Sequence, residues 1–168
     1  MTNEKQKRIV NDLQGGTYEL LGRIGEGGQG TVLKTDQVNL VVKITNVLPE
    51  IQLKEVRKQF KHVMRLPLRD LKIALPLSLL TLKNRAGYVM ELMDGLAPMT
   101  ELMQVATDAL MSDEGLSGYV KTGGLLRRLK MLARLARVLA DLHGRGLAYG
   151  DLSPANVFVS QSLEYAEV

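Results

Sequence analysis

The order of hydrophobic and polar positions divides the chain into a strand-rich part followed by a helix-rich part. Over residues 18–43, short β-prone runs alternate with turn residues, which predicts a three-stranded antiparallel meander. After Pro49, apolar residues recur at helical spacing with lysine and arginine between them, which predicts one amphipathic helix. Two further strand-like runs, residues 73–80 and 87–92, complete a predicted lobe of five strands and one helix.

The second part of the chain is dominated by a long helical pattern. Residues 99–111 and 125–143 are predicted as helices, and Gly144 suits the position that ends the longer one. A short strand is predicted at residues 157–159. One face of the longer helix carries charged side chains at steps of three and four, and we interpret it as solvent-exposed: Arg127, Lys130, Arg134, Arg137 and Asp141.

The composition is that of an ordinary globular domain. The 168 residues are 45% hydrophobic and 24% charged, which excludes a disordered chain. The absence of cysteine excludes disulfides and thiol chemistry, so we expect a cytoplasmic protein. No secretory signal is present, and no apolar run approaches the roughly 18 residues of a membrane span, so we expect no membrane partner. The net charge of +4 is spread along the chain and aromatics are only 4%, which argues against nucleic acid as a partner.

The segment GEGGQGTV places Gly25, Gly27 and Gly30 at the spacing G-x-G-x-x-G, a motif that is weak on its own. A Rossmann loop leads into a helix, whereas the residues after Gly30 predict a strand. We therefore expect the segment to join two antiparallel strands and to cover nucleotide phosphates, because glycine allows close backbone approach and its amides can point at anionic oxygens. The alternative is a flexible hairpin turn.

Lys43 interrupts the apolar run LVVKI. A lysine in such a strand is usually an edge or snorkelling residue. Beneath a phosphate-binding loop, an inward lysine would supply a positive charge for nucleotide phosphates, and it would need a carboxylate partner. The helix after Pro49 offers Glu50 and Glu55, of which we favour Glu55; both could equally be solvent-facing charges.

The segment YGDLSPANVFV places Asp151 and Asn156 in a loop just before a predicted strand. At this spacing the two side chains can divide the work of group transfer. Asp151 would position and deprotonate an incoming hydroxyl, while Asn156 would offer its amide oxygen to Mg²⁺. Alternatively, Asp151 only caps a turn and Asn156 only bonds to the backbone.

In this order and with these gaps, the segments resemble the eukaryotic-like protein kinase domain over residues 18–168. YELLGRIGEGGQGTVLK is similar to the family's first two strands and glycine-rich loop, LVVKI to the V-A-I-K strand, VMELMDG to the fifth strand and hinge, and YGDLSPAN to H-R-D-L-K-x-x-N. The resemblance implies an α+β, protein-kinase-like fold with a five-stranded antiparallel N-lobe, one helix and the first, mainly helical part of the C-lobe. The implied parts are an N-terminal extension (1–17), the N-lobe (18–93), and the hinge and partial C-lobe through the catalytic loop (94–168).

The resemblance also implies a function, which is ATP-dependent phosphoryl transfer to Ser or Thr hydroxyls of a protein substrate, with ATP and Mg²⁺ as cofactors. Lys43 would bind the α and β phosphates and pair with Glu55. Asp151 would be the catalytic base, and Asn156 would be a Mg²⁺ ligand.

Contacts to the nucleotide are implied for the glycine-rich loop and the hinge as well. Met90 would be the gatekeeper, and Glu91 and Met93 would offer backbone hydrogen bonds to adenine. The remaining nucleotide-binding residues implied by the resemblance are Gly25, Glu26, Gly27, Gly28, Gly30 and Val32.

Some positions depart from the family pattern. Tyr149 and Gly150 stand where the family usually has His and Arg, so the usual control by a phosphorylated activation loop is not expected. Ser153 replaces the lysine that assists transfer, which would affect the rate. The D-F-G element is expected roughly a dozen residues after Asn156, about where the sequence ends, so we interpret the chain as a kinase domain truncated before that element. The helix at residues 125–143 would then lack part of its packing surface.

Two other functions stay open. The chain could be a nucleotide-binding pseudokinase, or a split-kinase subunit whose remaining C-lobe is supplied by a second chain. Gly150-Asp151-Leu152 is also similar to the H-G-D-x-x-x-x-N loop of aminoglycoside and choline kinases, which would make the chain a small-molecule phosphotransferase.

Overall fold

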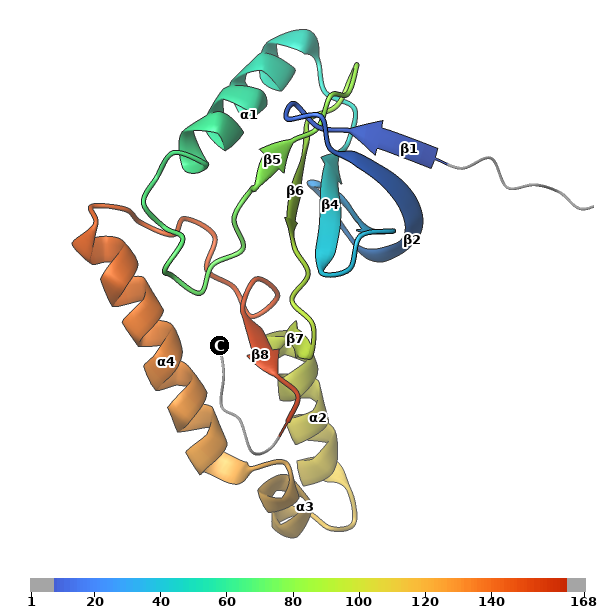
Figure 1. The fold of residues 1–168 in the computed structure, drawn as a ribbon. Coiled ribbons are helices and arrows are strands. Elements are labelled where there is room, and N and C mark those ends of the chain that lie inside the picture. The colour runs from blue at the N-terminus through green and yellow to red at the C-terminus, as the bar shows by residue number, and fades with distance from the viewer. Residues whose placement is uncertain (1–7, 163–168) are drawn as a thin grey trace, which may run out of the picture. The chain divides into compact units, whose positions relative to one another are not determined.

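The computed structural model describes residues 8–162, which form two compact units (Figure 1). The first unit comprises the residues up to Arg69 together with Ile73–Leu92. The second comprises Asp70–Lys72 and the residues from Met93 onward. The short segment Asp70–Lys72 therefore belongs to the second unit, although the chain on both sides of it belongs to the first.

The first unit is an antiparallel sheet with one helix. Six strands form the sheet in the order β1-β2-β3-β4-β6-β5. The strands are β1 (Arg8–Asn11), β2 (Thr17–Gly27), β3 (Gly30–Thr35), β4 (Leu40–Thr45), β5 (Ser78–Leu79) and β6 (Gly87–Glu91), and the helix is α1 (Glu50–Val63). The α+β prediction is confirmed, with one strand more than the five expected.

The additional strand, β1, lies within residues 1–17, which we interpreted as an N-terminal extension. It pairs with β2, and the turn between them is held by Asp12. The buried Asp12 carboxylate accepts hydrogen bonds from the Gly16 amide at 2.7 Å, the Gln14 amide at 2.9 Å and the Tyr18 hydroxyl at 2.9 Å. This side chain therefore joins the strand to the core.

Strand β5 is shorter than the predicted run of residues 73–80. Pro76 within that run has no N–H to donate to a neighbouring strand, which ends regular pairing on its side. The Leu77 amide still donates to the Val89 carbonyl at 2.8 Å. The pairing therefore begins only after the proline.

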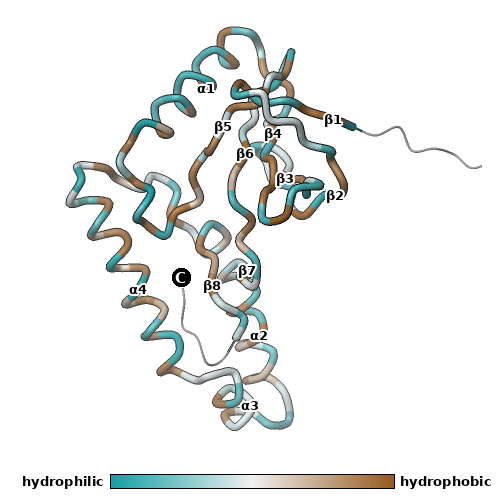
Figure 2. The backbone as a smooth tube through the Cα atoms, in the orientation of Figure 1, coloured by the Kyte–Doolittle hydropathy of each residue, from teal (hydrophilic) through white to brown (hydrophobic). Residues whose placement is uncertain are grey.

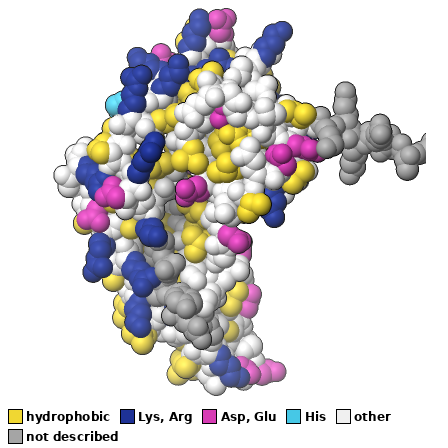
Figure 3. Space-filling model, in the orientation of Figure 1, with side chains coloured by type: hydrophobic (Ala, Val, Ile, Leu, Met, Phe, Trp, Pro, Cys, Tyr) yellow, Lys and Arg dark blue, Asp and Glu magenta, His cyan; other side chains and the backbone are white. Residues whose placement is uncertain are grey.

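One face of the sheet buries a hydrophobic core, and α1 packs against the other face. The core residues are Tyr18, Val42, Ile44, Leu80 and Val89. Phe60 of α1 meets Tyr88 of β6 edge to face, with ring centroids 4.8 Å apart. The Arg57 guanidinium donates to the carbonyls of Leu82 and Arg85. The opposite side of α1 is cationic, with lysine and arginine side chains over it in Figure 3.

The second unit contains a two-stranded sheet and three helices. They are β7 (Leu96–Pro98), α2 (Met99–Met111), α3 (Leu116–Lys121), α4 (Gly124–Gly144) and β8 (Phe158–Ser160), with β7 antiparallel to β8. Met131 of α4 packs with Val157 and Val159 in a buried cluster, against which Met99, Leu102 and Leu135 also pack. The helix predicted at residues 99–111 has the predicted bounds.

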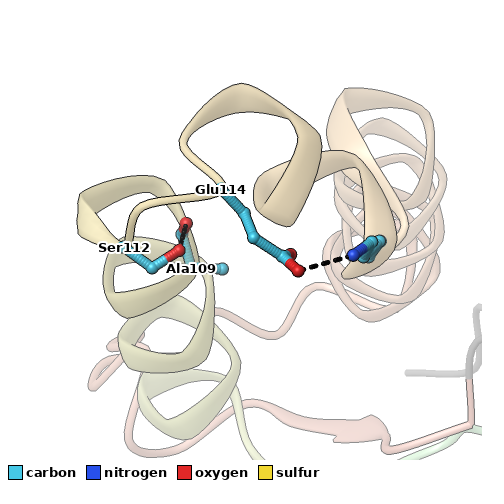
Figure 4. Close-up of polar contacts among 4 residues, drawn as sticks. Ala109, Ser112 and Glu114 are labelled. Atoms are coloured by element: carbon cyan, nitrogen blue, oxygen red, sulfur yellow. Dashed lines mark hydrogen bonds and ion pairs between the residues drawn. The ribbon is translucent and has the colours of Figure 1, made fainter.

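Helix α3 was not predicted, and local polar contacts stabilise the turn before it. The Ser112 hydroxyl donates to the Ala109 carbonyl at 2.7 Å, and Glu114 pairs with Lys121 at 2.7 Å (Figure 4). The helix has only six residues, fewer than two turns, so its apolar residues show no helical period and the sequence pattern did not indicate it.

Helix α4 differs from its sequence interpretation at Arg127 and Gly144. Arg127 is buried rather than on the solvent-exposed face, and it donates to the Ser160 carbonyl at 2.7 Å and the Thr122 carbonyl at 3.1 Å. Gly144 remains helical, and Gly146 takes the left-handed conformation with φ 74°. A left-handed residue after a helix is a common way to bond its last carbonyls.

Helix α4 also leaves several leucines exposed to solvent. Leu125, Leu129 and Leu132 are 62%, 53% and 51% exposed. Figure 2 shows hydrophobic and hydrophilic positions alternating along α4. No helix within residues 8–162 is long and apolar enough to cross a membrane.

Candidate active site

The glycine-rich segment forms a hairpin between β2 and β3. Gly27 pairs with Gly30, so only Gly28 and Gln29 lie between the strands. This is the predicted strand-loop-strand arrangement and not a loop leading into a helix. The Asn46 side chain, just after β4, donates to the Gly28 carbonyl at 2.9 Å.

The glycines of this hairpin have different physical roles. Gly30 has φ +147°, and a Cβ there would lie 2.2 Å from the Ile44 carbonyl oxygen. Only glycine therefore fits where β3 approaches β4. A Cβ on Gly25 would make ordinary contact with Val32 at 3.8 Å, and Gly27 and Gly28 face open space. Packing within the described chain therefore does not require glycine at Gly27 and Gly28.

Two side chains of this region carry charge. Glu26 forms an exposed ion pair with Arg23 on the same strand. Lys43 is half-buried at the centre of β4, opposite Val32 of β3 and Tyr88 of β6. Residues paired across strands share a face of the sheet, so Lys43 lies on the face of Val32 and Tyr88.

Lys43 also shares its face with α1. Its chain neighbours Val42 and Ile44 are buried in the core on the other face. Because Phe60 of α1 contacts Tyr88, α1 covers the Lys43 face. A carboxylate from α1 is therefore on the correct side of the sheet to meet the lysine.

The structure does not join Lys43 to either candidate glutamate. Glu55 is exposed and makes no ion pair with Lys43. Glu50 pairs instead with Lys54, 2.9 Å away and one turn along α1. The pairing of Lys43 with Glu55 therefore stays a prediction.

The residues expected to meet adenine lie at the end of β6. Met90 is half-buried and pairs with Val41 of β4. Because side chains alternate along a strand, Met90 shares the face of Tyr88, and hence that of Lys43. Glu91 pairs with Leu40 and ends the strand.

Met93 follows closely and is the residue at which the second unit resumes. Between it and β6, the Leu92 amide donates to the Asn39 carbonyl at 2.8 Å. This bond extends the pairing of the sheet by one residue past β6.

In the second unit, Asp151 and Asn156 contact each other directly. The Asn156 side-chain amide donates to the Asp151 carboxylate at 2.9 Å and to the Asp151 carbonyl at 3.0 Å. Both residues are exposed, and the loop leads into buried Val157. Because the amide nitrogen is committed to Asp151, Asn156 presents its amide oxygen, which is the atom that a Mg²⁺ ion prefers. Within residues 8–162, no group of three or more His, Asp or Glu side chains forms a metal cage.

An ion pair just before this loop in the chain was not indicated by the sequence. Arg145, directly after α4, binds both carboxylate oxygens of Asp70, at 2.7 and 2.5 Å. The hydrogen bond from Arg145 lowers the pKa of Asp70 to about 2. The partners are 75 residues apart and neither belongs to a motif, so no pattern in the sequence indicates the pair.

The buried Arg127 was also missed as a structural residue. Burial, and after it the neighbouring Arg128 charge, lower the pKa of Arg127. The Arg128 guanidinium stacks on the Tyr119 ring, 4.5 Å from its centroid. The position of Arg127 in a periodic row of charged residues gave no indication that its side chain is buried.

The site residues thus fall into two groups, each described within its own unit. One sheet face of the first unit carries Val32, Lys43 and Met90 beside the glycine-rich hairpin. One loop of the second unit carries Asp151 and Asn156.

No protein-family model matches the chain. Among solved structures, the chain is similar to a mutant of the PknI kinase domain from Mycobacterium tuberculosis, with a TM-score of 0.59 and 14% identity over 95% of this chain and 59% of that chain. It is also similar to vaccinia related kinase 3, with a TM-score of 0.59 and 15% identity over 95% of this chain and 48% of that chain. The chain thus spans less than two thirds of either neighbour. At these identities the likeness concerns the fold alone, and that fold is protein-kinase-like.

Proposed function

We propose that this protein binds ATP with Mg²⁺ and transfers the γ-phosphoryl group to Ser or Thr hydroxyls of protein substrates. The observation that carries the proposal is the pairing of Val32 with Lys43, which places a half-buried lysine beside a glycine-rich hairpin. Backbone amides at such a tip and a lysine charge together suit a chain of phosphates.

Most of the proposed nucleotide contacts come from residues of the six-stranded sheet and its glycine-rich hairpin. The hairpin of Gly25, Gly27, Gly28 and Gly30 covers the phosphates, and Lys43 supplies the charge for the α and β groups. Met90, Glu91 and Met93 meet the base. Glu55 on α1 is the proposed partner of Lys43, and it would form the pair on nucleotide binding.

The proposed chemistry belongs to the second unit. Asp151 accepts the hydroxyl proton of the substrate, and Asn156 offers its amide oxygen to Mg²⁺. The metal, when bound, neutralises charge on the phosphates. The bond between the two side chains supports this assignment, because it orients the asparagine and holds the carboxylate in place.

Because the chain spans only 59% and 48% of the neighbouring kinase chains, further C-lobe residues form part of this proposal. They would come from additional sequence of the same protein or from a second chain. The cysteine-free composition supports a cytoplasmic site of action.

A second candidate is nucleotide binding without transfer. Two observations favour it: Ser153 stands where transfer is normally assisted by lysine, and Glu55 does not contact Lys43. In that case the protein would act as a pseudokinase or as one subunit of a split kinase.

Transfer of labelled γ-phosphate tests the proposal. The purified chain is incubated with labelled ATP, Mg²⁺ and either a mixed protein substrate, an aminoglycoside or choline. We expect label on protein Ser or Thr, and we expect Asp151→Asn to reduce it about a hundredfold or more. Asp113→Asn, an exposed aspartate of the same unit, serves as control.

The other outcomes separate the candidates. Label only on a small molecule would contradict the protein-kinase assignment. ATP binding detected by thermal shift without any transfer or dependence on Mg²⁺ would favour the pseudokinase. Full transfer by Asp151→Asn would show that another group is the base.

A further inference from the structure

The tip of the glycine-rich hairpin has an unusual distribution of hydrogen bonds. Within residues 8–162, the backbone N–H groups of Gly28 and Gln29 have no hydrogen-bond partner. The Gly28 carbonyl between them accepts a bond from the Asn46 side chain at 2.9 Å. The tip therefore presents free donors, while its acceptor is occupied.

Peptide geometry links these two facts. The Gly28 carbonyl and the Gln29 N–H belong to one peptide unit, which is planar and trans, so they point in opposite directions. By holding the carbonyl, Asn46 also sets the direction of the Gln29 N–H. Gly28 has no Cβ and faces open space, so nothing else about that residue resists rotation of the peptide.

The position of Asn46 is itself well determined. It follows Thr45, which pairs with Gly30 across β3 and β4. The Thr45 amide donates to the Ala86 carbonyl at 2.9 Å, and the Thr45 hydroxyl accepts from the Ala86 amide at 3.0 Å. Gly30 lies so close to β4 that the base of the hairpin cannot slide. The side chain thus connects a well-anchored strand end to the hairpin tip.

We propose that Asn46 is a positioning residue which orients the Gly28–Gln29 peptide so that its N–H, and not its carbonyl oxygen, faces the phosphate chain of the nucleotide. The inference rests on the proposed ATP binding but concerns a residue outside the motifs that suggested it. A carbonyl turned toward a phosphate would place two negative oxygens against each other, whereas an N–H donates a charge-assisted bond.

The experiment measures affinities of the full chain for ATP, ADP, AMP and adenosine by calorimetry. Loss of one neutral hydrogen bond, here the one from the Asn46 side chain to the Gly28 carbonyl, corresponds to about a fivefold weaker affinity. We expect Asn46→Ala to weaken ATP binding by about fivefold and to leave adenosine binding unchanged, because adenosine has no phosphate. Asn46→Asp, which lacks the donor and adds a negative charge, should weaken ATP binding at least as much. Asn46→Gln, which keeps the amide, should recover part of the loss.

Asn84→Ala is the matched control, because this exposed asparagine lies in the loop between β5 and β6 and makes no side-chain bond in the described chain. As a second readout, ATP should shift the Gln29 amide resonance in the wild type but not in Asn46→Ala.

Each outcome is decisive. Equal weakening of ATP and adenosine by Asn46→Ala, or unchanged ATP affinity, would overturn the positioning role while leaving ATP binding intact. Phosphate-dependent weakening without any phosphoryl transfer by the wild type would support the role of Asn46 and refute only the transfer step. No binding of any of the four compounds by the wild type would overturn both proposals.

Discussion

Replacement of Gly30 by alanine should destabilise the first unit severely. Gly30 has φ +147°, and an added Cβ would lie 2.2 Å from the Ile44 carbonyl oxygen and 2.8 Å from the Thr45 Cα. These atoms belong to the backbone of the paired strand β4, so they cannot move aside as a flexible side chain could. The pairing of β3 with β4 must therefore open locally.

The magnitude follows from two costs. Forcing an L residue into this conformation costs about 1–3 kcal/mol, and overpacking a well-fitted position costs about 1–3 kcal/mol more. Gly30→Ala should thus lower the free energy of unfolding by about 3 kcal/mol or more, a large share of the roughly 5–15 kcal/mol typical of a domain. In urea, this corresponds to a midpoint lower by about 2 M.

Equilibrium unfolding in urea, followed by circular dichroism, measures this effect. Gly22→Ala is the control, because Gly22 lies in β2 with ordinary φ and nothing within 4 Å of an added Cβ. We expect Gly22→Ala to change the free energy of unfolding by less than about 1 kcal/mol. If Gly30→Ala matched Gly22→Ala, the inference that close approach to β4 requires glycine would be refuted.

Two other predictions concern the second unit. Because the hydrogen bond from Arg145 lowers the pKa of Asp70 from 3.8 to about 2, the pair stabilises the fold above about pH 4 and loses that effect as the pH falls toward 2. Asp70→Asn should therefore lower the urea midpoint at pH 6 but not near pH 2, and a difference between the two proteins that is the same at both pH values would contradict this. Arg127→Met removes the bonds to the Ser160 and Thr122 carbonyls and should destabilise the fold by about 1–3 kcal/mol. The exposed Arg134→Met should change stability by less than about 0.5 kcal/mol, and equal melting temperatures for the two variants would show that burial of Arg127 contributes nothing.

Most of the regular elements could be predicted because their residues interact with near neighbours in the chain. Helices α1, α2 and α4 carry apolar side chains at helical spacing, and the observed bounds of α2 are those predicted. The hairpin at Gly28 and Gln29 was predicted because the strand pattern resumes directly after the glycines. Helix α3 was not recognised, because its six residues span fewer than two turns and show no period. Strand β1 was not recognised, because it lies within residues that were interpreted as an N-terminal extension.

The candidate site, too, could be predicted from the sequence only in part. The residue types and spacing of Lys43, Asp151 and Asn156 suggested phosphate chemistry before any fold was known. Which face of the sheet Lys43 occupies, and that Asn156 donates to Asp151, depends on pairing and on side-chain rotamers, neither of which periodicity specifies. The absence of an ion pair between Lys43 and Glu55 likewise depends on where α1 packs.

Local order along the chain was thus enough to identify most of the elements, the hairpin and the chemical groups at the site. The contacts that hold those groups join residues far apart in sequence: Asn46 to Gly28, Arg127 to Ser160, and Arg145 to Asp70. Each is a polar contact whose two ends look like ordinary exposed residues in the sequence. Hydrophobic periodicity records which side of an element is buried, but a hydrogen bond between distant residues exists only once the backbone has brought donor and acceptor within about 3 Å.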